Sequence, residues 1–268
     1  WMVLFERARL KFVSRDFRER RERHVDPVRL ARIDACWSTA IGLTLIDNLT
    51  AMLFAARHLR LALAAGEPVR VARGLALEAG FLASTRGTRA AQETRELLDR
   101  SHEIAERTGS AYVLGLVELV RGLGPSHAGQ WEEAIVRFRR AVEIFRERCA
   151  GLVPERMNAE IWPISPLFYG GHIRELCART DELVQVGAER NNLFYEISAR
   201  IGHGNFSWLV RDDPDGASEE LRYTREVGSP KGMHKLHYQT LADVQIALYR
   251  GHAGAAHARA GRGGVVLG

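Results

Sequence analysis

The chain has 268 residues, of which 46% are hydrophobic and 26% are charged, and its formal net charge is +5. This composition is typical of a folded protein and excludes a disordered chain. Three isolated cysteines, Cys36, Cys149 and Cys177, form no CxxC pair and no evident disulfide framework, so a cytoplasmic location is expected.

Most of the excess positive charge lies in the N-terminal segment. Residues 1–33 contain ten Arg or Lys and five acidic side chains, whereas the rest of the chain is electrically balanced. We expect residues 1–24 to form a basic helix, and residues 1–25 to be a terminal or linker element separate from the main fold. Its arginines suit the phosphates of a nucleic acid, but the exposed face of a linker helix is favoured, because no aromatic ladder, zinc site or helix-turn-helix accompanies the charge.

Apolar helices follow this arm. Asp26-Pro27 is a typical helix start, and the residues from Leu30 to Ala65 predict two helices that end at Gly66-Glu67-Pro68. A third apolar helix is predicted from Val69 to Ser84. The weakly charged run 35–56 contains an aspartate near its centre, which costs roughly 3 kcal/mol inside a membrane, so a buried helix is favoured and no membrane partner is expected.

The segment from Gly129 to Ala141 has the clearest pattern. Gly129 ends a turn, and after it apolar residues recur at steps of three and four, as on one face of an α-helix. The order Gly-x-aromatic-x-x-Ala-x-x-x-Phe-x-x-Ala resembles the second half of a tetratricopeptide repeat. A helix pair of this type buries its apolar face only against neighbours like itself. The expected packing residues of the repeat are Gly122, Gly129, Trp131, Ala134, Phe138 and Ala141.

Turn residues recur along the chain at Gly87, Gly129, Gly171, Asp212 and Gly251, with separations of 42, 42, 41 and 39 residues. This spacing, without any strand pattern, predicts an all-α fold: an α-solenoid of stacked helical hairpins, tetratricopeptide-like, with a period of about 40 over residues 26–258. Prolines at 154, 163 and 166 are expected to break one helix. Residues 259–268 abandon the helical pattern and are expected to be a frayed or truncated tail. The helices expected around these turns span 88–108, 112–122, 172–190, 214–227 and 253 onward.

A further set of motifs occurs in the order Arg32-Ile-Asp-Ala-Cys-Trp-Ser-Thr-Ala-Ile-Gly-Leu, Arg57-His-Leu, Ala64-Ala-Gly-Glu-Pro-Val-Arg-Val-Ala-Arg, Phe145-Arg-Glu-Arg-Cys, Trp208-Leu-Val-Arg-Asp-Asp-Pro, His237-Tyr and Leu248-Tyr-Arg-Gly. This order resembles the C-terminal helical region of large bacterial serine/threonine protein kinases that also carry an AAA-type ATPase module. The resemblance spans most of residues 3–257 and departs at Pro125-Ser-His, at Val227-Gly-Ser and after His257. It implies a kinase in the same polypeptide, and because position 1 is Trp, we expect the chain to be a segment of a longer protein.

Motifs for catalysis or cofactor binding are absent from the sequence. It contains neither the glycine-rich and catalytic loops of a kinase nor a Walker A sequence. Gly202-His-Gly-Asn lacks the lysine of a phosphate loop and is interpreted as close helix packing. His234 and His237 with Asp243 are too few ligands for a zinc site. Asp212-Asp213-Pro214 is interpreted as a helix start rather than a catalytic pair of carboxylates. We therefore expect no catalytic residue, cofactor or metal.

The function that this pattern favours is non-catalytic. In stacked helix pairs the first helix of each pair lines a concave surface that binds proteins. The candidate contact faces are 113–123, 197–210 and 234–249. We expect an interaction and regulatory segment of a signalling kinase, whose partner is a protein or another domain of the same polypeptide. The alternative is a regulator associated with nucleic acid through the basic arm, although nucleic acid is the less favoured partner.

Overall fold

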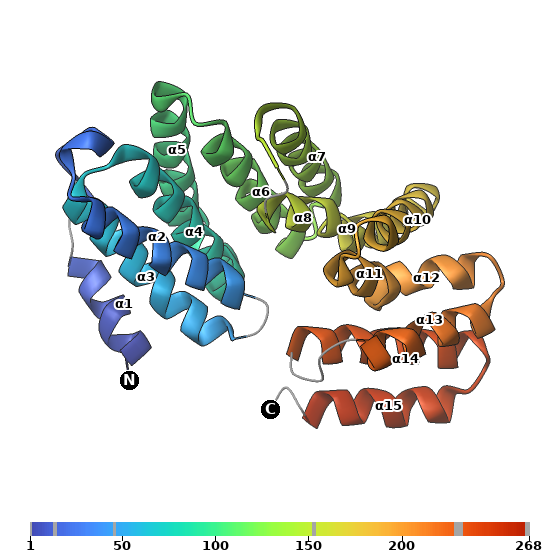
Figure 1. Ribbon diagram of the computed structural model, residues 1–268. Helices are drawn as coiled ribbons and strands as arrows, with labels where there is room; N and C mark the ends of the chain where they lie inside the picture. The colour runs from blue at the N-terminus through green and yellow to red at the C-terminus, as the bar shows by residue number, and fades with distance from the viewer. Residues whose placement is uncertain (1, 13–14, 45–46, 152–153, 228–232, 266–268) are drawn as a thin grey trace. The chain divides into compact units, whose positions relative to one another are not determined.

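The computed structural model describes residues 2–12, 15–44, 47–151, 154–227 and 233–265. Over these residues the protein is all-α, as predicted, and contains no strand. The chain divides into two compact units, Trp1–Glu160 and Ile161–Gly268, which we name the N-terminal and C-terminal units (Figure 1).

Helices of similar length follow one another in the N-terminal unit. α2, α4 and α6 each pack against the helix that follows, and α4 also packs against α6 (Figure 1). We name α2, α4 and α6 first helices, and α3, α5 and α7 second helices. The bounds are α1 Met2–Phe12, α2 Pro27–Leu43, α3 Asn48–Ala65, α4 Pro68–Arg86, α5 Ala91–Thr108, α6 Ala111–His127, α7 Trp131–Arg148 and α8 Pro154–Ile161, with short 3-10 helices at Glu22–His24 and Gly87–Ala90.

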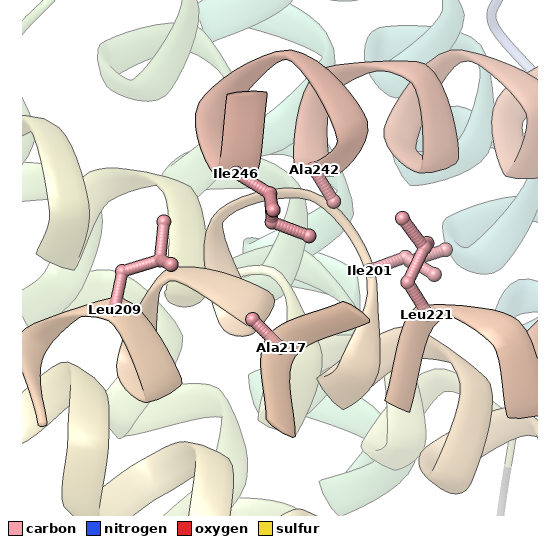
Figure 2. Close-up of a cluster of buried hydrophobic side chains, with 6 residues drawn as sticks. All are labelled: Ile201, Leu209, Ala217, Leu221, Ala242 and Ile246. Carbon is pink, nitrogen blue, oxygen red and sulfur yellow. The ribbon is translucent and has the colours of Figure 1, made fainter. Parts of the chain in front are cut away.

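The C-terminal unit continues the same alternation. Its first helices α9, α12 and α14 pack against the second helices α10, α13 and α15, and α12 also contacts α9 and α14. Figure 2 shows part of its core, where six buried apolar side chains converge: Ile201 just before α12, Leu209 near its end, Ala217 and Leu221 of α13, and Ala242 and Ile246 of α14. The bounds are α9 Ile164–Tyr169, α10 Ile173–Glu189, α11 Leu193–Arg200, α12 Gly202–Val210, α13 Pro214–Val227, α14 Met233–Tyr249 and α15 Ala253–Val265.

The five predicted turn residues all have a positive φ angle. Gly87, Gly129, Gly171 and Gly251 have φ angles of 52°, 76°, 76° and 76°, and Asp212 has a φ of 59°. A positive φ is accessible to glycine at little cost and to aspartate at a moderate one. Each of these residues lies at the turn between a first helix and the second helix that follows it. The spacing read from the sequence therefore marks real turns.

A second series of positive-φ residues was not predicted. Gly66, Gly109, Gly151 and Asn191 have φ angles of 79°, 69°, 78° and 49°, and they are separated by 43, 42 and 40 residues. Each follows a second helix: Gly66 and Gly109 precede α4 and α6, Gly151 follows α7, and Asn191 lies between α10 and α11. At Gly66 the backbone N–H donates to the carbonyl of Ala62 at 2.8 Å, which satisfies a carbonyl of the last turn of α3. Between Gly66 and Asp212, two residues with a positive φ thus recur in each stretch of about 40 residues, and Gly202, with a φ of 58°, belongs to neither series.

Gly129→Ala is expected to lower the free energy of unfolding by about 1 kcal/mol, because an L-residue is strained at a φ of 76°. Steric overlap contributes nothing, since the added Cβ would have only Trp131 within 4 Å, at 3.7 Å. Urea denaturation measures the effect. Gly42→Ala in α2 is the control: its Cβ meets nothing within 4 Å, so helix propensity makes that change neutral or stabilising. Equal effects of both changes would contradict the strain.

The expected N-terminal helix over residues 1–24 is wrong. α1 ends at Phe12, residues 15–21 are not helical, and a 3-10 turn spans Glu22–His24. The physical reason is that the chain here crosses the N-terminal unit: the Arg20 N–H donates to the carbonyl of Gly66 at 2.8 Å, and Asp16 pairs with Arg100 at 3.3 Å. These tertiary contacts replace the helical hydrogen bonds.

Two further boundaries differ from expectation. α15 reaches Val265, so helical backbone occupies most of the tail 259–268 that was expected to fray; Arg259 fixes it by donating to the carbonyl of Asp243 at 3.0 Å. Residues 197–210 form two helices instead of one, because Ile201 is extended (φ −116°, ψ 165°). Prolines 154, 163 and 166 break the helix before Gly171, as predicted, since α8 ends at Ile161 and α9 begins at Ile164.

Candidate functional site

The six predicted packing residues lie at the junction of α6 and α7. Gly122 is buried on α6, and Gly129 lies in the exposed turn between the helices. Ala134, Phe138 and Ala141 on α7 are fully buried. Trp131 is half-buried at the first position of α7. A Cβ on Gly122 would lie 2.5 Å from the ring of Phe138, so this glycine is what lets the ring approach α6.

A second glycine–phenylalanine pair in the same junction was missed. A Cβ on Gly115 would lie 2.6 Å from the ring of Phe145, which is fully buried. Gly115 precedes Gly122 by seven residues and Phe145 follows Phe138 by seven. Seven residues are about two turns of helix, so each helix presents both of its partners on one face. This heptad spacing was the signal available in the sequence.

A polar and aromatic cluster extends over successive first helices of the N-terminal unit. Asp34 on α2 accepts hydrogen bonds from Arg70 Nε at 2.9 Å and Nη2 at 2.7 Å, and it also pairs with Arg73 of α4. Partial burial raises the pKa of Asp34, but the two arginines outweigh burial and hold this pKa below its usual value. The Arg73 guanidinium lies over the ring of Trp37 at 4.9 Å, which is a cation–π contact.

Two residues complete this cluster from later helices. Tyr112 of α6 lies with its ring centroid 6.4 Å from that of Trp37, and its hydroxyl donates to Glu155 Oε1 of α8 at 2.5 Å. Burial and the Glu155 carboxylate raise the pKa of Tyr112 well above its usual value, so its hydroxyl stays a donor. We name Asp34, Trp37, Arg73, Tyr112 and Glu155 the first-helix cluster. None of these five was predicted as a site residue, because no two are close in sequence except Asp34 and Trp37.

Behind Trp37 lies a fully buried histidine. His58 Nδ1 is 2.9 Å from the carbonyl of Ile33, and its Nε2 is 3.0 Å from the carbonyl of Arg70. Burial and the charge of Arg73 lower the pKa of His58 to about 4, although the two carbonyls and Asp34 act in the opposite sense. The neutral ring has one N–H and so donates to one of these two carbonyls.

The lowered pKa of His58 predicts a loss of stability in acid. Because the unfolded chain binds this proton near pH 6.5 and the folded protein only near pH 4, stability is complete above pH 6.5 and falls with pH towards 4. The contribution lost between pH 7 and pH 5 is about 2 kcal/mol. Urea unfolding at both pH values should show that the free energy of unfolding of His58→Gln falls less than that of the wild type, and that the difference is this amount. The exposed His252→Gln is the control and should behave as the wild type. A loss of stability between pH 7 and pH 5 in His58→Gln equal to that of the wild type would contradict the prediction.

The C-terminal unit brings together a serine and a histidine, which was not predicted. Ser165 Oγ on α9 lies 3.0 Å from Nδ1 of His203 on α12. The rings of Phe168 and Tyr169 lie 4.4 Å and 4.7 Å from the imidazole. Burial, and secondarily the charge of His237, lower the pKa of His203 to about 4. Activation of a serine also requires a group that orients the base, and no carboxylate is bonded to His203 within the described ranges.

The remaining predicted motifs have structural roles or lie partly outside the described residues. A Cβ on Gly204 would overlap the carbonyl oxygen of Ala199, which confirms close packing at Gly202-His-Gly-Asn. Asp213 caps α13 by accepting the N–H of Gly216 at 2.8 Å. The side chain of His234 lies outside the described residues, and within them no three His, Cys, Asp or Glu side chains gather as metal ligands do.

The fold defines an all-α protein. In the part of the chain that the structure describes, none of the helices combines the length and the low polarity needed to traverse a bilayer. No family model matches the chain, and searches of curated proteins and of solved structures likewise give no match.

Proposed function

We propose that this chain is a non-catalytic protein-interaction segment built as an α-solenoid of two-helix units. The observation that supports the proposal is the recurrence, between Gly66 and Asp212, of two positive-φ turn residues in each stretch of about 40 residues. Repeats of this length bury their apolar faces against neighbouring repeats, and their first helices form a surface for partners. The motif order that resembles the C-terminal region of bacterial serine/threonine kinases is consistent with a place in a signalling protein.

The polar and aromatic side chains of the first helices suit recognition of a protein partner. The members of the first-helix cluster bind one another, and Trp37 and Glu155 are buried, so exposed side chains of the first helices must supply the contacts to a partner. In the C-terminal unit the exposed Tyr169 on α9 and His237 on α14 also belong to first helices. The partner is a protein or another domain of the same polypeptide.

Selection of a phage-displayed peptide library against the whole chain tests this proposal. Peptides that bind should lose affinity to the variant Tyr169→Ala/His237→Ala on first helices. The matched control Val136→Ala/Arg174→Ala changes exposed side chains of second helices and should keep the affinity. Selection of no peptide, or equal losses in both variants, would contradict an interaction surface on the first helices.

Small-angle X-ray scattering tests the solenoid separately. A compact globule of this length has a radius of gyration of about 18 Å. A solenoid should give a clearly larger value and an asymmetric distance distribution. A radius near 18 Å would reject the solenoid without bearing on the peptide experiment.

A further inference from the structure

The N-terminal arm crosses the end of α3 at a fixed point. Its backbone is held there by the hydrogen bond from the Arg20 N–H to the carbonyl of Gly66 at 2.8 Å. The crossing is so close that a Cβ on Gly66 would overlap the carbonyl oxygen of Arg18. The chain therefore presents the side chains of residues 18–24 from an anchored backbone, instead of from a free tail.

The acidic and basic side chains of this crossing have different surroundings. Asp16 pairs with Arg100 at 3.3 Å, Glu19 pairs with Arg107, and Glu22 pairs with Arg70 at 3.1 Å. Each of these acidic residues thus has an arginine of α4 or α5 as a partner, although Arg70 also pairs with Asp34 and Glu67. Five arginines of the arm have no carboxylate partner among the described residues: Arg9, Arg18, Arg20, Arg21 and Arg23.

Three of these arginines surround one hollow. Arg18, Arg20 and Arg21 line a depression that is open to solvent, together with His24 and with Glu19, whose charge is balanced by Arg107. Guanidinium groups bind phosphate oxygens through paired hydrogen bonds, and an anchored backbone reduces the entropy lost on binding. We propose that this hollow is a binding site for the phosphate group of a phosphate monoester.

The distribution of charge favours one phosphate group over a nucleic-acid strand. Binding to a nucleic acid requires basic side chains that follow several successive phosphates. Towards the N-terminus, however, Arg15 pairs with Glu93 at 2.6 Å and Arg7 pairs with Glu78 at 2.5 Å. Arg9, in α1, has no carboxylate partner in the part of the chain that the structure describes, and its guanidinium lies over the ring of Phe5 at 5.4 Å. Three of the five arginines without a carboxylate partner therefore gather at the hollow, which suits one doubly charged group.

Isothermal titration of the whole chain with phenyl phosphate, inorganic phosphate and a short DNA duplex tests this site. The variant Arg18→Gln/Arg20→Gln/Arg21→Gln should bind phenyl phosphate at least about tenfold more weakly than the wild type. The control Arg89→Gln/Arg174→Gln/Arg190→Gln removes three exposed arginines elsewhere, with the same change of net charge, and should bind as the wild type. Urea unfolding verifies that both variants remain folded.

Each result decides between the alternatives. Binding of phenyl phosphate that the arm variant loses and the control keeps supports the site, and tighter binding of phenyl phosphate than of inorganic phosphate identifies an ester as the ligand. No binding by the wild type, or equal losses in both variants, overturns it. Stronger binding of the duplex with a steep dependence on salt concentration also overturns it and favours the nucleic-acid alternative.

Discussion

Gly122→Ala is expected to destabilise the N-terminal unit by about 2 kcal/mol, although a glycine-to-alanine change inside a helix usually stabilises. Alanine gains up to about 1 kcal/mol from helix propensity. This gain is outweighed because the new Cβ would lie 2.5 Å from the ring of Phe138, which is fully buried. Overpacking of this type costs about 1–3 kcal/mol. Urea unfolding measures the difference.

A smaller side chain at position 138 should relieve this overlap. Phe138→Leu alone costs about 1–2 kcal/mol, because it leaves space beside Gly122. In the double variant Gly122→Ala/Phe138→Leu the alanine methyl group fills part of that space. The double variant should therefore lose less free energy of unfolding, by at least about 1 kcal/mol, than the two single variants lose in sum. Simple additivity would show that the glycine and the ring do not compete for the same volume.

Gly204→Ala is expected to destabilise the C-terminal unit by about 3 kcal/mol. Its Cβ would overlap the carbonyl oxygen of Ala199, which is a backbone atom at the break between α11 and α12. Relief requires the two helices to move apart, and this movement disturbs the hydrogen bonds that Asn205 Nδ2 donates to the carbonyls of Arg200 at 3.0 Å and Ala217 at 2.9 Å.

The contrast with Gly122 is the sharpest test of this interpretation. Because the obstacle at Gly204 is backbone, no reduction of a neighbouring side chain should rescue the variant. Gly254→Ala in α15 is the control, since its Cβ meets nothing within 4 Å. Hydrogen exchange should show lost protection in α12 and α13. A cost below about 1 kcal/mol, or unchanged protection, would show that the break adapts easily.

The helices and the first series of turns could be predicted because both depend on local sequence. Apolar spacing identified the face of α7 that contains Ala134, Phe138 and Ala141, and regular glycines identified the turns. The second series of turns was equally visible at Gly66, Gly109 and Gly151. Gly66 was predicted to end a helix, but the period was missed because glycines elsewhere, such as Gly115 and Gly122, permit close packing and obscure it.

Contacts between distant residues account for what could not be predicted. The arm has a helical composition, but Arg15 reaches Glu93 and the Arg20 N–H reaches Gly66, so its helix ends at Phe12. Tyr112 and Glu155 are likewise separated by 43 residues. No spacing rule relates such positions. Local propensity sets where helices form, and these pairings set where they stop and which side chains meet.

The matching turns have a consequence for how such a chain changes length. Gly129 and Gly171 share a φ of 76°, and the residues after them, Gln130 (φ −90°, ψ 68°) and His172 (φ −77°, ψ 52°), have nearly the same conformation. Excision of residues 130–171 would therefore join two ends of equal geometry, and a duplication of the same segment would insert without strain at its seam. At this seam the local backbone accommodates a gain or loss of 42 residues, whereas a deletion of arbitrary length would place a residue other than Gly, Asp or Asn at a positive φ, which costs free energy.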